Sequence, residues 1–190
     1  MKYLHLDAEM GGRGLKFSLL TAYFRVTDQN FNTLGYLSLA VKPDDGVYIV
    51  SGQGMTVNKI DLAQHDKVAI TYKEAKPLLY KFLSAQSNNG KDKLTPVGHG
   101  VRGDIDHVID KLISTGSWEQ HCTYHYIDTS VVLQFLRACG KIPMHIDGSV
   151  TGLVEYFQLP ISTKVDWHNA EFDTMMTMLV YQKMVDLGKS

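Results

Sequence analysis

The chain has 190 residues, of which 44% are hydrophobic and 21% are charged. This is the composition of an ordinary globular protein, and the length suits one hydrophobic core, so we expect a single domain over residues 1–190. The formal net charge of −1 and the isoelectric point of about 6.7 argue against a strongly basic protein that coats long stretches of nucleic acid. An enzyme that grips only a few nucleotides remains compatible with this charge, because bound metal ions can supply positive charge.

The two cysteines and the absence of a long apolar run narrow the cellular setting. Cys122 and Cys139 are too few for a disulfide framework and too far apart for a zinc ligand pair, which fits a reducing compartment. No apolar run approaches the roughly 20 residues that span a bilayer, and the apolar character of the first residues breaks off at Asp7, too early for a secretory signal. We therefore expect a cytoplasmic protein with no membrane partner.

The first half of the chain predicts three strands and then a helix. Alternating or β-rich runs cover residues 2–7, 17–27 and 34–41, and the turn-prone residues 28–30 join the second to the third. This pattern predicts an antiparallel meander. The chain changes character from Asp61, and residues 73–83 carry apolar side chains at helical spacing after Thr71, which can cap the helix.

The second half predicts strands that alternate with helices. Short strands are expected at 94–97 and 124–127, and helices at 103–113, 131–138, 150–157 and 169–187. A meander followed by such alternation predicts an α/β protein with a mixed five-stranded sheet, antiparallel at first and then parallel, flanked by helices.

Asp7 and Glu9 stand two residues apart at the end of the first strand, so both side chains point to the same side of the backbone. Two carboxylates placed in this way can share a hard cation such as Mg²⁺, which leaves its other coordination positions to water and substrate phosphate. A solvated strand end explains the same pattern in most proteins, so the pair is a weak signal when taken alone.

A third carboxylate, Asp104, lies in the first turn of the helix that follows the strand 94–97. In this position it would face the sheet edge from which Asp7 emerges. The simpler interpretation is that Asp104 favours the positive end of the helix dipole. Asp106 competes for the same role, but it points to another face of the helix.

His168 and Asp173 form the third element, at the start of the last helix. Asp173 would be held rigidly by the helix, whereas His168 would lie on the approach to it. A metal ligand benefits from stiff support, and a general base has to reach a water molecule and then release a proton to solvent.

Taken together, these residues resemble the DnaQ-like (DEDDh) family of 3′–5′ exonucleases, which have a ribonuclease H-like fold. The resemblance covers essentially the whole chain. Its three motifs stand at Asp7-Ala8-Glu9, at His99 with Asp104, and at His168 with Ala170 and Asp173. The chain departs from the family where Met10-Gly11-Gly12 replaces a polar turn, and where Gly100 and Gly103 replace Asn and Phe.

The resemblance implies a two-metal hydrolase acting on the 3′ end of single-stranded DNA or RNA. Two divalent cations, Mg²⁺ or Mn²⁺, would be held by four carboxylates and His168 would act as the base, so that nucleoside 5′-monophosphates are released. The metal ligands would be Asp7, Glu9, Asp104 and Asp173. The residues expected near the terminal nucleotide are Met10, Gly11, Met55, Asn58 and His99. The sequence does not decide between DNA and RNA. It also leaves the oligomeric state open, and a homodimer is one of the possibilities.

Two other functions fit parts of the sequence. Gly98-x-Gly100-x-x-Gly103, between a strand and a helix, matches the dinucleotide-binding pattern, but it leaves residues 1–90 unexplained and Pro96 suits a central strand poorly. The alternative of a different class is a nucleic-acid-binding scaffold of the same fold that has lost catalysis. The presence of all five catalytic positions argues against it.

Overall fold

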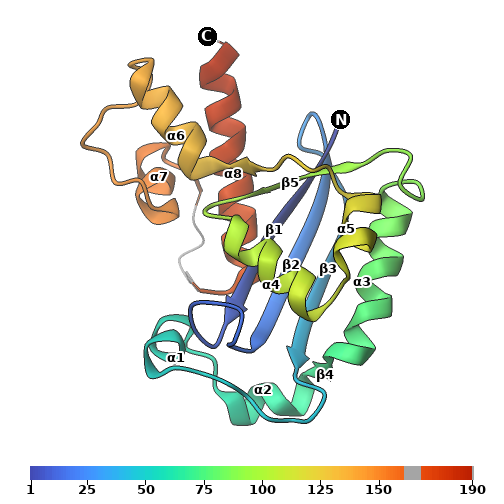
Figure 1. The fold of residues 1–190 in the computed structure, drawn as a ribbon. Helices are drawn as coiled ribbons and strands as arrows, with labels where there is room; N and C mark the ends of the chain where they lie inside the picture. Colours follow the sequence, from blue (N-terminus) through green and yellow to red (C-terminus); the bar gives the residue numbers. More distant parts are fainter. Residues whose placement is uncertain (161–167, 190) are drawn as a thin grey trace.

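A six-stranded sheet forms the centre of the protein, described here from a computed structural model over residues 1–160 and 168–189. The spatial order of the strands is β4-β3-β2-β1-β5-β6 (Figure 1). The strands are β1 Lys2–Met10, β2 Leu19–Asp28, β3 Thr33–Lys42, β4 Ile70–Thr71, β5 Leu94–Gly98 and β6 Ile127–Asp128.

Helices lie on the sheet and around its ends. Figure 1 shows α4 in front of the strands, α5 beside α3, and α6 and α7 beside α8, which lies against β1 and β2. The helices are α1 Gly52–Asn58, α2 Leu62–Val68, α3 Tyr72–Gln86, α4 Arg102–Lys111, α5 Thr115–His121, α6 Thr129–Ala138, α7 Val150–Tyr156 and α8 Ala170–Lys189. No helix in the described part of the chain is both long enough and apolar enough to cross a membrane.

The mixed α/β sheet that the sequence predicts is confirmed, with one strand more than expected. Strands β1, β2 and β3 form the antiparallel meander, and β5 and β6 continue the sheet in parallel. The additional strand, β4, is only two residues long and pairs in parallel with Val41 and Lys42 of β3. Pro96 lies in β5 beside Leu4 of β1, and the pairing of β5 with β6 begins one residue later, at Val97. Pro96 therefore lies within a strand that has neighbours on both sides, in contrast to the expectation from sequence.

Several helix boundaries follow from local side-chain chemistry. Thr71 and Glu74 form a reciprocal capping box at the start of α3. The side chain of Asp128 accepts a hydrogen bond from the backbone N–H of Ser130 at the start of α6, and Gly140 has a φ of 70° beyond its end. These signals are local in the sequence, which is why the corresponding helices could be predicted.

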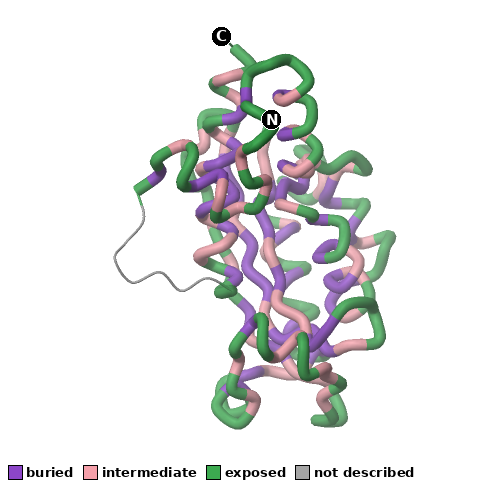
Figure 2. Tube along the Cα trace, turned by 90° about the vertical axis from the view of Figure 1, so that its left-hand side faces the viewer, coloured by how far each residue is buried: buried purple, intermediate pink, exposed green. Residues whose placement is uncertain are grey.

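The two faces of β1 have different partners. Leu4, Leu6 and Ala8 pack in the main hydrophobic core, together with buried residues of α3, α4 and α5. Tyr3 and His5 point the other way, and their ring centroids lie 5.5 and 6.5 Å from that of Tyr181 in α8. Figure 2 shows buried segments in the interior of the molecule and exposed segments around them. Because side chains alternate along a strand, Asp7 and Glu9 continue the face that α8 covers.

Candidate active site at the end of the first strand

Strand β1 delivers Asp7 and Glu9 to the edge of the sheet where α4 and α8 begin. Asp7 pairs with Tyr23 and Glu9 with Thr21 of β2, and the register shifts between Glu9 and Met10. Such irregularities often lie next to active sites, because they change the direction of the side chains that follow. Both carboxylates are thus held on a central strand of the sheet.

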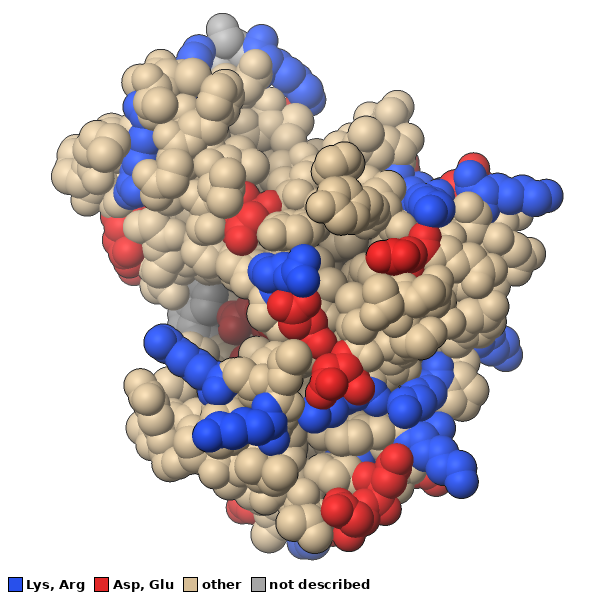
Figure 3. Space-filling view, in the orientation of Figure 1, with Lys and Arg blue, Asp and Glu red and all other residues tan. Residues whose placement is uncertain are grey.

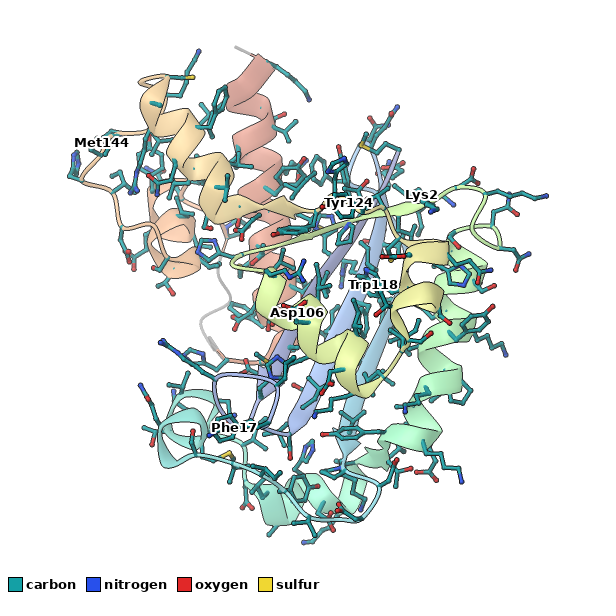
Figure 4. All side chains as sticks on the ribbon, in the orientation of Figure 1. Lys2, Phe17, Asp106, Trp118, Tyr124 and Met144 are labelled. Carbon is teal, nitrogen blue, oxygen red and sulfur yellow. The ribbon has the colours of Figure 1, made fainter. Side chains whose placement is uncertain are left out.

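Asp104 reaches the same edge from α4, where it is 8% exposed. The backbone N–H of Ala8 donates to its carboxylate, which ties the first turn of α4 to β1 between Asp7 and Glu9. Asp106, the competitor, forms an ion pair with Arg102 at 2.9 Å on the exposed surface of α4 (Figure 4). The structure therefore brings Asp104, and not Asp106, to the carboxylate pair.

His168 and Asp173 approach from the start of α8. The backbone N–H of His168 donates to Oδ2 of Asp173 at 3.1 Å, and His168 has a φ of 70°, an uncommon value for a residue with a side chain. The metal-binding atoms of Glu9, His168 and Asp173 all lie within 4.8 Å of one another. His168 is nevertheless exposed, so its imidazole can exchange protons with solvent.

Burial and nearby negative charges raise the pKa of three of the four carboxylates. Burial, followed by the negative charges of Asp104, Glu9 and Asp173, raises the pKa of Asp7 well above its ordinary value. Burial, followed by Asp173 and Asp104, raises the pKa of Glu9 to about 8. Burial also raises the pKa of Asp104 to about 7, against the effect of the N–H groups that it accepts from. At neutral pH the cluster therefore favours binding protons or cations.

The donor set fits hard divalent cations. Within the described ranges, no Lys or Arg forms an ion pair with Asp7, Glu9 or Asp104. The group offers carboxylate oxygens, which Mg²⁺ and Mn²⁺ prefer, and it offers no thiolate. Buried carboxylates that repel one another, and that form no ion pair with a Lys or Arg in the part of the chain that the structure describes, are suited to binding metal ions.

A pocket of about 370 Å³ opens directly beside Glu9. Met10 and Asn58, two of the residues predicted to contact substrate, line it, whereas Gly11 and Met55 do not. The Asn58 side chain donates to the Met10 carbonyl at 3.0 Å, so it also fixes the strand end. The lining consists of Ala8, Glu9, Met10, Gly12, Arg13, Phe17, Ser51, Gln53, Gly54, Val57 and Asn58.

The glycines that replace the family's polar turn have a packing reason. A Cβ atom on Gly11 would come within 2.7 Å of Val50, and one on Gly12 within 2.9 Å of the Phe17 ring. A Cβ atom on Gly54 would lie 2.4 Å from the Gly11 carbonyl oxygen. Helix α1 can therefore lie against the end of β1 only because these positions have no side chain.

His99 lies in the turn between β5 and α4, apart from this pocket. Its Nδ1 is 2.8 Å from the Thr129 hydroxyl, and burial lowers its pKa, although Asp128 and Asp147 oppose the change. Gly98 and Gly100 in the same turn also have structural reasons. A Cβ atom on Gly98 would lie 2.5 Å from the Val101 side chain, and Gly100 has a φ of 66°. Two of the three glycines of the pattern are thus explained without a dinucleotide, and the antiparallel half of the sheet differs from a doubly wound parallel sheet.

Sequence reasoning missed several residues of the site. Arg13 and Phe17, on the loop between β1 and β2, line the pocket together with Gln53 and Val57 of α1 (Figure 4). Asp128, predicted only as a helix cap, adds negative charge that raises the pKa of Asp104. The one signal in the sequence was the placement of Arg13 in a glycine-rich segment immediately after the Asp7–Glu9 motif.

Comparisons with known proteins support the fold. No family model and no curated protein matches the sequence. A crystal structure of E. coli exonuclease I in complex with a dT13 oligonucleotide matches with a TM-score of 0.76 at 15% identity, covering 96% of this chain and 40% of that one. Exonuclease X in complex with 5′ overhanging duplex DNA gives 0.66 at 16% identity, covering 100% of this chain and 93% of that one.

Cell-death related nuclease 4 (CRN-4) is also similar, with a TM-score of 0.71 at 15% identity over 98% of this chain and 64% of that one. The chain thus spans about two fifths of the length of exonuclease I. The fold that the sequence motifs indicated is confirmed: the chain has the ribonuclease H-like α/β fold of these solved nucleases.

Proposed function

We propose that residues 1–190 form a metal-dependent 3′–5′ exonuclease domain that releases nucleoside 5′-monophosphates from single-stranded DNA or RNA. The observation that carries this proposal is the convergence of four carboxylates and one histidine from β1, α4 and α8 at one edge of the sheet. Similarity to exonuclease I bound to dT13, and to exonuclease X bound to overhanging duplex DNA, supports a nucleic-acid substrate.

The four carboxylates would hold two divalent cations, Mg²⁺ or Mn²⁺. Asp7 interacts electrostatically with all three of the others, so it is suited to a position between the two ions. When bound, such ions neutralise charge on the scissile phosphate and lower the pKa of water, so that an attacking hydroxide is available near neutral pH. This arrangement would also relieve the mutual repulsion of the carboxylates.

His168 would accept the proton of the attacking water. It lies beside Glu9 and Asp173, and its exposure lets the proton leave to solvent afterwards. The hydrogen bond from its backbone N–H to Asp173 holds the base close to a metal ligand. Histidine is the side chain that most often serves as a general base.

The pocket between β1 and α1 would receive the nucleoside at the 3′ end. Its volume of about 370 Å³ is in the range of pockets that hold small ligands. Phe17 and Val57 offer apolar surface for a base, and the Met10 and Gly11 backbone lies next to Glu9. Met55 and His99 do not line the pocket, so we do not assign them to the nucleoside site.

Degradation of end-labelled oligonucleotides tests the proposal. Single-stranded DNA and RNA carrying a 5′ label should shorten one nucleotide at a time with Mg²⁺ or Mn²⁺, and EDTA should stop the reaction. Asp7→Asn should abolish it, whereas Asp106→Asn on the exposed side of α4 serves as the matched control. Digestion that continues when the 3′ end is blocked would contradict the polarity. Full activity of Asp7→Asn would contradict the site.

A further inference from the structure

The loop between β1 and β2, residues 11–18, borders the pocket. It carries two cationic residues, Arg13 and Lys16. We propose that Arg13 and Lys16 of this loop bind backbone phosphates of the substrate next to the one that is cut. This inference rests on the proposed function and adds that the enzyme senses a chain of at least three nucleotides. Arg13 and Lys16 would be substrate-binding residues, and His107 would be a positioning residue for the loop.

Arg13 is placed to meet an anion inside the site. It lines the same pocket as Glu9, yet among the described residues it forms no ion pair with any carboxylate. Arg13 is also exposed, so a phosphate outside the nucleoside pocket can reach it. A phosphate held at the metal ions would leave its neighbour along the chain free to reach Arg13, whose planar group binds phosphate oxygens in pairs.

Lys16 adds a second positive charge on the same loop. Its Nζ lies 5.0 Å from the centroid of the Phe17 ring, and Phe17 lines the pocket. This cation–π contact holds the ammonium group beside a residue that lines the pocket. Figure 3 shows recessed acidic side chains in a hollow and cationic side chains along its lower edge.

The loop is held in place by the helix that carries Asp104. His107 Nε2 lies 3.1 Å from the Gly14 carbonyl oxygen, and Lys111 Nζ donates to the Leu15 carbonyl at 2.9 Å. Gly14 has a φ of 95°, which lets its carbonyl turn towards α4. Because these carbonyls face α4, the loop is already ordered before substrate binds, and less entropy is lost on binding.

The negative charge of the site explains why cationic residues beside it, Arg13 and Lys16, are useful. The four carboxylates repel a polyanion, and the chain as a whole has a net charge of −1. Metal ions compensate at the scissile phosphate, but they do not compensate at the phosphates beyond it. Cations on the loop attract the phosphates where the metal ions do not reach. A mononucleotide lacks these phosphates, which would favour its release as product.

The salt dependence of binding tests the proposal. A 5′-labelled single-stranded decamer is titrated in an Asp7→Asn background with Mg²⁺, so that binding is measured without cleavage. For single strands each phosphate contact contributes a slope of about −0.7 in the plot of log K against log salt. Arg13→Gln and Lys16→Gln should each flatten the slope by about 0.7 and weaken binding about fivefold at 0.1 M salt. Lys81→Gln on α3 is the matched control.

A substrate variant identifies the phosphates. When one linkage next to the terminal one is an uncharged methylphosphonate, the parent should lose about fivefold in affinity, and Arg13→Gln should lose little further. His107→Leu, which frees the loop, should flatten the salt slope as Arg13→Gln and Lys16→Gln do, and His107→Gln, which keeps a donor, should restore it. Unchanged slopes in a parent that binds the decamer would overturn the proposal. If the Asp7→Asn parent does not bind the decamer and the wild-type protein does not degrade nucleic acid, the proposed function itself is refuted.

Discussion

Removing the charge of Glu9 should stabilise the metal-free protein while it abolishes activity. In the folded protein this carboxyl keeps its proton up to a pKa of about 8, whereas its ordinary value is 4.5. The unfolded chain therefore releases the proton first. Stability should fall as pH rises from about 4.5 to about 8, and should then level off with respect to this group.

The size of the effect follows from the difference between the two pKa values. Between pH 4.5 and 7.5 the folded state loses roughly 4 kcal/mol relative to the unfolded state. Because Glu9 is partly exposed, we halve this to about 2 kcal/mol to allow for solvent screening. For a chain of this length the corresponding rise in melting temperature is about 4–8 °C.

Thermal unfolding of wild type and Glu9→Gln in EDTA, from pH 5 to pH 8.5, measures this directly. The two melting temperatures should converge at low pH and separate as pH rises. Glu155→Gln, which changes an exposed carboxylate on α7, should follow the wild type. Mg²⁺ should raise the melting temperature of wild type more than that of Glu9→Gln. A Glu9→Gln protein no more stable than wild type at pH 8 would refute the reasoning.

Three further predictions concern catalysis and packing. His168→Ala should lower the turnover number by 10²–10⁴-fold with an unchanged melting temperature, because an exposed base contributes to proton transfer and little to the core. Asp104→Asn should abolish metal-dependent hydrolysis, and calorimetric titration should show weakened Mn²⁺ binding; unchanged binding would remove Asp104 from the ligand set. Gly54→Ala should cost about 1–3 kcal/mol in urea unfolding, since its Cβ would meet the Gly11 carbonyl, and normal stability would show that α1 can shift freely.

The arrangement of the carboxylates could be anticipated because each one is tied to a local signal. Asp7 and Glu9 follow strand alternation, and Asp104 and Asp173 both lie in the first turn of a helix that the sequence marks well. Because β1 lies beside β5 in the sheet, the side chains that these signals position meet at the end of β1. The choice of Asp104 over Asp106 also followed from the sequence, because the two residues point to different faces of the helix, and in the structure Asp106 pairs with Arg102 instead.

The nucleotide pocket was harder to predict, because α1 has little local signal. Its sequence includes two glycines, a threonine and a valine, which are poor or middling helix formers, and the helix depends on the Ser51 cap and on contact with β1. Because the sequence did not predict a helix at 52–58, it could not show that Gln53 and Val57 share a helix face that excludes Met55. The roles of Arg13 and Phe17 likewise depend on a loop conformation that α4 imposes through contacts nearly a hundred residues away.

The close contact between Gly11 and Gly54 has a consequence for engineering. Because backbone meets backbone there, the inner wall of the pocket cannot be altered by substitution without moving α1. Gln53 and Val57 border the same space and are exposed, so they can vary at low cost to the fold. A library intended to change nucleotide preference should therefore randomise these two positions and leave the glycines fixed.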